Sequence, residues 1–350
     1  RTANAVNRPY LTAEVFYAFI RQNQPSTLPG DLLPDRPEEW EDWITSLVAQ
    51  CADGIPLLED NLRAEIIENA LKQNMVSRHV ANGKQAILDA LAERKTDLVL
   101  EKPLLDGTGS LQTLLDTSTV PSNKHRSVGD CFAQARGFTP AFWQSMAGIS
   151  GLNNARVEDF RTTTDLGWIT GTFDSMITHL KTGLQNGTYA AVSNVAKLST
   201  SDWLSVISLN GNNVPPWISG DTVYQKRAAY AALLKNNAET RFPAVSLIAD
   251  TGRSDAHALG SVENILAAIE AKPDFDLKRD SCQHLFADTG AGLSEHERMA
   301  TKVLQRVHRV ASSADAGVKM LEAGFYSAAQ VYRNGRANFV DTMEKKGMAK

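Results

Sequence analysis

Apolar residues recur at helical spacing in segment after segment of this chain. Residues 173–184 carry them at positions i, i+3, i+4, i+7 and i+11, and the same period runs through residues 40–48, 262–269 and 303–310. A helix places side chains at this spacing on one face, where they can be buried together. Each segment therefore predicts an amphipathic helix, and none of them requires a strand.

Helix-start signals agree with these segments. Thr139 precedes Pro140 as an N-cap followed by a first-turn proline, and Ser294 stands three residues before Glu297 as a capping box. Residues 96–110 differ, because an alternating stretch there is followed by a glycine-rich turn. We therefore expect an all-α fold, a multi-lobed array of helix pairs, with at most one short hairpin.

Prolines and capping residues mark out a helical module between residues 198 and 277. Ser199 and Asp202 predict a helix start, and the pair Pro215–Pro216 predicts its end. A second helix is expected to run to Pro243, and Pro273 is expected to close the unit. The residues to which we assign a structural role are Trp143, Trp203, Pro215, Tyr230, Pro243, Phe275 and Gly324.

Glycine and proline clusters divide the chain into four expected helical segments, residues 1–125, 126–197, 198–292 and 293–350. The second and third share a weak echo, because Trp143 and Trp203 align in similar sequences sixty positions apart. Gly324 stands between two apolar helical runs, as in a helix–hairpin–helix turn. Because no excess of Lys and Arg surrounds it, we expect a structural turn and no contact with DNA.

Charge and composition limit the classes of partner. The net charge is -4, without long runs of either sign, which predicts no nucleic-acid partner. No apolar run is long enough to cross a bilayer, so this segment is not expected to insert into a membrane. The three cysteines are far apart and odd in number, which excludes a closed disulfide framework. Because the sequence opens without an initiator Met or a leader, we expect a piece of a larger polypeptide.

Motifs for chemistry are scarce. The sequence contains no HExxH, GxSxG, Walker or GxGxxG motif, and we expect no catalytic, cofactor-binding or metal-binding residue. Two histidine-containing pairs could be imagined as metal ligands, Cys282 with His284 and His296 with His308. No further ligand of suitable spacing accompanies either pair.

The tripeptide Asp-Thr-Gly occurs twice, beginning at Asp250 and at Asp288. Aspartic proteases use a pair of such aspartates as an acid–base dyad, so a hydrolase is one alternative function. Both copies here follow helix-like segments, whereas those enzymes place them on strand loops. We therefore favour a helix C-terminus followed by a glycine C-cap.

Aromatic residues suggest a second kind of site. Stacked rings often line sugar-binding sites, but no pair of carboxylates stands beside these in a recognisable pattern, so we favour core packing. The residues concerned are Trp143, Trp203, Trp217, Tyr224 and Tyr230.

Four blocks together resemble the A subunits of insecticidal toxin complexes (Tc toxins) and their large relatives, often labelled neuraminidase-like. The first is LTAEVFYAFIRQNQPSTL from Leu11, and the second is FWQSMAG with DFRTTTDLGWITGTFDSMITHL. The third is the module from LSTSDWLSVI to PDFDL, and the fourth is LQRVHRV followed by MLEAGFYSAAQVYRNGRANFV. Nothing in this sequence resembles the apolar pore-forming channel of an A subunit or the region that holds the B subunit.

The resemblance implies a non-enzymatic shell or scaffold segment of a secreted toxin component. In the full-length, homo-oligomeric parent, such a component attaches to a cell-surface receptor and delivers a toxic cargo. No catalytic residue is carried over to this sequence. The alternative to a segment of a large parent is a free-standing helical module that binds a peptide or protein in a groove between helices.

Overall fold

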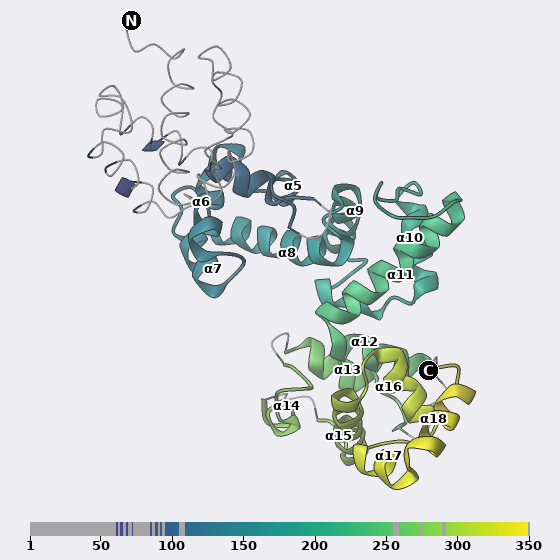
Figure 1. Ribbon diagram of the computed structural model, residues 1–350. Coiled ribbons are helices and arrows are strands. Elements are labelled where there is room, and N and C mark those ends of the chain that lie inside the picture. The colour runs from purple at the N-terminus through teal and green to yellow at the C-terminus, as the bar shows by residue number, and fades with distance from the viewer. Residues whose placement is uncertain are drawn as a thin grey trace, which may run out of the picture. The chain divides into compact units, whose positions relative to one another are not determined.

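The computed structural model describes residues 61–101 in part, and residues 102–104, 109–254, 259–272, 275–288 and 292–348 (Figure 1). The regular structure of these residues is helical, and they form no strand or sheet, which confirms the all-α fold. The helices are α5 (Leu111–Asp116), η3 (Ser122–Lys124), α6 (His125–Ala135), α7 (Pro140–Ala147), α8 (Asn154–Thr170), α9 (Asp174–Gln185), η4 (Val192–Lys197), α10 (Thr200–Leu209), α11 (Val223–Arg241), α12 (Pro243–Arg253), α13 (Glu263–Glu270), α14 (Cys282–Asp288), α15 (Glu295–Val310), α16 (Ala314–Glu322), α17 (Ala328–Asn334) and α18 (Arg336–Lys345).

Backbone contacts divide the chain into two compact units. The first comprises residues 1–102, 110–112 and 120–157, and the second comprises residues 103–109, 113–119 and 158–350. The expected division into four helical segments remains a prediction.

An aromatic cluster joins α6 to α7 in the first unit. The ring of Phe138 stacks on Trp143 with 5.9 Å between centroids, and Phe142 and Phe132 meet edge to face at 5.9 Å. Phe142 is completely buried. Thr139 accepts a hydrogen bond from the backbone N–H of Phe142, which confirms the expected N-cap of α7.

The core of the second unit includes the packing of α10 against α11. Trp203 on α10 and Tyr230 on α11 are both completely buried. The Tyr230 hydroxyl donates a hydrogen bond of 3.1 Å to the carbonyl of Thr170, and burial raises the pKa of this hydroxyl. The phenol is thus a packing residue whose one polar group is satisfied.

Helix α12 is central to the rest of the second unit, because α11, α13, α15 and α16 all pack against it. Gly317 lies where α16 meets α12. A Cβ atom at this position would stand 2.8 Å from Cδ1 of Leu247, closer than real Cβ contacts allow. Glycine therefore lets the two helices approach each other at this point.

Of the hairpin expected within residues 96–110, the described residues show only isolated bridge positions at residues 103 and 110. Residues 95–101 are helical, and the Thr96 hydroxyl bonds to the carbonyl of Ala92, one helical turn earlier. The backbone N–H of Leu104 reaches the carbonyl of Gly109 at 3.2 Å, while residues 105–108 lie outside the described part of the chain. Thr96 and Leu100, four residues apart, face Gly129, so the apparent alternation belongs to one face of a helix.

The proline module is partly as expected. The capping box of Ser199 and Asp202 starts α10, and α11 ends just before Pro243, which begins α12. The predicted end of α10 at Pro215 is wrong, because the helix stops at Leu209 and residues 211 and 212 adopt left-handed backbone conformations. Pro273 and the segment 40–48 lie outside the described residues.

Two other local expectations concern the C-terminal helices. The capping box of Ser294 and Glu297 begins α15, as predicted. After α16, Gly324 has φ 78°, and the backbone N–H of Phe325 bonds to the carbonyl of Met320 at 2.8 Å. This is the hydrogen bond of a Schellman motif, so the turn at Gly324 ends one helix before α17 starts.

Candidate functional site

Pro243 and Phe275 are the two sequence-selected structural residues that line a common cavity. The cavity has a volume of about 380 Å³ and lies in the second unit, where α11 gives way to α12. The other selected residues lie apart from it: Trp143 in the aromatic cluster, Trp203, Pro215 and Tyr230 in buried positions, and Gly324 in the turn after α16.

The wall of this Pro243 cavity combines apolar side chains with polar and charged ones. Phe242 and Val245 contribute from the α11–α12 junction, Ile269 from α13, and Leu277 and Phe275 from the loop before α14. Pro243 is the first residue of α12, a position where its missing backbone N–H leaves no intrahelical hydrogen bond unmade. The apolar part of this wall could contact an apolar side chain, and the charged part a polar one.

Charged residues at this cavity are engaged by other parts of the protein. The Arg241 guanidinium pairs with Asp165 at 2.8 Å, and Glu270 pairs with Lys197 at 2.6 Å. The Lys272 ammonium bonds to the carbonyl of His284 at 2.6 Å. Among the described residues that line the Pro243 cavity there is no histidine or cysteine.

A larger groove, of about 640 Å³, is lined by polar side chains of α5, α9 and the end of α10. Asp116, Asp174 and His179 contribute the titratable groups. No group of three or more His, Cys, Asp or Glu residues in the described ranges is arranged to hold a metal ion. The groove is therefore a hydrophilic surface feature without a cation site among those residues.

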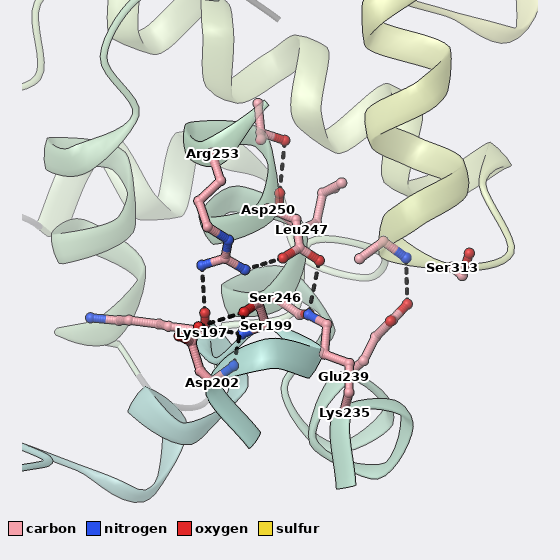
Figure 2. A network of polar contacts seen from close by, with 12 residues as sticks. Lys197, Ser199, Asp202, Lys235, Glu239, Ser246, Leu247, Asp250, Arg253 and Ser313 are labelled. Carbon is pink, nitrogen blue, oxygen red and sulfur yellow. Dashed lines mark hydrogen bonds and ion pairs between the residues drawn. The ribbon is translucent and has the colours of Figure 1, made fainter. Parts of the chain in front are cut away.

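Asp250 is the centre of a polar network that connects three helices (Figure 2). Its Oδ2 atom accepts a hydrogen bond of 2.8 Å from the Lys235 ammonium of α11, and its Oδ1 atom pairs with Arg253 on α12 itself. The Arg253 guanidinium also donates a hydrogen bond to the carbonyl of Lys197, which lies next to the capping box of α10. Lys235 also bonds to Ser246 at 2.8 Å. The network thus links α11, α12 and the approach to α10.

This network bears on the proposed aspartate dyad. Each carboxylate oxygen of Asp250 contacts a cation, so both are engaged within the protein. The predicted glycine C-cap after Asp250 is wrong in detail, because Gly252 lies inside α12 and Ser254 is the C-cap. Asp288 is the last residue of α14, and its side chain lies outside the described residues, as does Gly290.

The members of the two imagined metal-ligand pairs differ in burial and position. The Cys282 thiol is buried, donates to the side-chain oxygen of Gln305 at 3.2 Å, and has a pKa raised by burial, while His284 is exposed. His296 and His308 stand in the first and last turns of α15. Cys131 is half-buried and has no disulfide partner in the described part of the chain.

Core packing is confirmed for two of the aromatic residues suggested as a sugar site, Trp203 and Tyr230, which are fully buried. Trp217 is half-buried and meets Phe173 edge to face at 6.1 Å. For Tyr224 the expectation of core packing is wrong, since 72% of this residue is exposed in the first turn of α11. The aromatic rings therefore do not form one platform.

Comparison with protein-family models, with curated proteins and with solved structures gives no match to this chain. No helix in the described ranges combines the length and the apolar character needed to cross a membrane. The sequence motifs did not point to Lys181, and they marked His308 only as an imaginable metal ligand, although both residues are buried. The sequence contained a signal for the burial of both residues. Each lies in a segment with apolar residues at helical spacing, residues 173–184 for Lys181 and 303–310 for His308.

Proposed function

We propose that this chain is a non-enzymatic helical scaffold. The observation that carries the proposal is the position of Asp250, which holds cations from two helices with its two carboxylate oxygens. In the described residues the conspicuous charged clusters join helices, and the buried aromatic side chains fill the space between them. Such contacts hold the helices in fixed positions, and a scaffold of this kind would bind its partners through its surface.

The substitution Asp250→Asn tests this proposal against the hydrolase alternative. Loss of the charge leaves Lys235 and Arg253 without their carboxylate, and we expect the free energy of unfolding to fall by about 1–3 kcal/mol. Chemical denaturation measures this change. The control is Asp341→Asn, which breaks an exposed pair with Lys345 and should cost less than about 0.5 kcal/mol.

A proteolysis assay with denatured casein at acid pH accompanies the unfolding measurement. A scaffold should leave casein intact before and after substitution. Cleavage by the wild-type chain that disappears in Asp250→Asn, with stability unchanged, would establish the hydrolase and reject the scaffold.

The larger context of the scaffold is a secreted Tc-toxin A-like protein, in line with the resemblance of four sequence blocks. The segment would contribute helical bulk to a homo-oligomer that attaches to a cell-surface receptor and delivers a toxic cargo. The measurement that tests this is the sequence of the complete gene. We expect a reading frame far longer than the 350 codons of this chain, with an apolar channel-forming segment elsewhere in the frame.

A free-standing interaction module is the second candidate, and the Pro243 cavity favours it. A cavity of about 380 Å³ whose wall includes both apolar and charged side chains could receive a side chain of a peptide. A complete reading frame about as long as this chain would favour the module over the toxin segment.

A further inference from the structure

A second cavity, of about 240 Å³, shares Thr240 and Pro243 with the Pro243 cavity. Its walls come from α11, from the loop before α14, from the end of α15 and from the segment that leads into α16. We call it the His308 cavity. Its volume is small for a ligand site, so it suits a single functional group with a short attachment.

His308 is the unusual residue of this cavity. It lies in the last turn of α15 with only 7% of its surface exposed. Its Nε2 atom is buried and has no hydrogen-bond partner among the described residues. Buried polar atoms nearly always have a partner, so a group from outside the described chain can supply the missing hydrogen bond.

Of the charged groups that act on His308, the Lys278 ammonium has the largest influence. The Lys278 ammonium has no carboxylate partner in the described part of the chain. Glu239 is already engaged, because one of its carboxylate oxygens accepts the backbone N–H of Ala314 at the start of α16. Asp276 accepts the backbone N–H of Lys278 at 2.7 Å. Among the described residues the Lys278 ammonium thus has no ion-pair partner, while the Glu239 and Asp276 carboxylates keep their charge but each already accepts a backbone N–H.

The ionisation of His308 reflects the same surroundings. Burial is the main cause that lowers its pKa to about 4, the Lys278 charge lowers it further, and Asp276 acts in the opposite direction. The ring is therefore neutral at neutral pH. An anion beside the ring would favour the protonated form and raise this pKa.

We infer that the His308 cavity binds a small oxyanion, a carboxylate or phosphate group, between the Lys278 ammonium and the His308 ring. The Ser312 hydroxyl and the Asn236 amide also line the cavity and can donate hydrogen bonds. The binding step involves no covalent change. The inference does not depend on whether the chain is a toxin scaffold or a free-standing module.

Binding of this kind must be coupled to pH. Between pH 6.5 and about 4, the unfolded chain binds a proton at His308 that the folded chain does not bind. The free energy of unfolding therefore falls as the pH drops through this window. An anion that raises the folded-state pKa recovers part of this loss, so it should stabilise the protein more at pH 5 than at pH 7.5.

Thermal unfolding of the complete chain with sulfate and with formate tests the inference. Both probes stay ionised at pH 5 and pH 7.5, and they represent the phosphate and the carboxylate group respectively. At low millimolar concentration and constant ionic strength, at least one should raise the melting temperature by a few degrees at pH 5 and by less at pH 7.5. The imidazole NMR signal of His308 should show a pKa that rises with the same probe.

Variants separate a built site from general salt effects. Lys278→Gln and His308→Gln should abolish the shift, Lys278→Arg should keep most of it, and the exposed control Lys226→Gln should keep all of it. Since Lys278 is exposed, Lys278→Gln remains informative even if His308→Gln does not fold. Equal shifts in all variants, or no shift and no change in the His308 pKa in the wild type, would overturn the inference.

Discussion

Replacement of Trp203 by alanine is expected to lower the free energy of unfolding by about 3–5 kcal/mol. The indole is one of the largest fully buried side chains in the described part of the chain, at 0% exposure, and it lies where α10 packs against α11. Alanine would leave a cavity that two helices cannot close without moving apart. Denaturation in urea or guanidinium, followed by circular dichroism, measures the loss.

Two matched variants identify the cause of that loss. Trp203→Phe keeps most of the apolar volume and removes an indole N–H that has no hydrogen-bond partner among the described residues, so it should cost much less than Trp203→Ala. Trp168→Ala removes an indole that is 45% exposed and should also cost less. A loss below about 1 kcal/mol for Trp203→Ala would show that the α10–α11 interface does not depend on this ring.

The sequence predicted those features of the fold that depend on a few neighbouring residues. A capping box needs two side chains three positions apart, and both boxes, at Ser199 and at Ser294, start helices as expected. Helical periodicity likewise identified α9, whose residues Met176, Ile177 and Leu180 are fully buried. Predictions from these local signals are correct because the local preference and the final packing favour the same conformation.

Features that depend on distant partners were not predicted. The prolyl pair at Pro215 looked like the end of α10, but the left-handed residues after Leu209 end it earlier. The Asp250 network could not be anticipated either, since Lys235 and Lys197 are brought to it by other elements of the second unit. A motif search reads residues in order, whereas these contacts are set by how the helices pack.

Lys181 is expected to be nearly as important to stability as Trp203, although it is a charged residue. It lies four positions after Ile177 on the apolar face of α9, with a side chain only 10% exposed. Its ammonium contacts the carboxylate of Asp159 at 2.8 Å, the carbonyl of Thr117 at 2.9 Å and the hydroxyl of Thr163 at 2.9 Å. A single side chain thus ties α9 to α8 and to the segment after α5.

Lys181→Met should therefore lower the free energy of unfolding by about 2–4 kcal/mol, because it leaves the Asp159 carboxylate and the Thr117 carbonyl without their cation. The control Lys226→Met, at an exposed position of α11, should change stability by less than about 0.5 kcal/mol. A double-mutant cycle with Asp159→Asn isolates the pair, since the combined loss should fall short of the sum by more than about 0.5 kcal/mol. Strict additivity would mean that the ammonium acts through Thr117 and Thr163 alone. The Lys181 ammonium can lie on the apolar face of α9 only when α8 and the segment after α5 supply its three acceptors. The cycle therefore measures how strongly this ion pair favours the observed packing of α9 against α8.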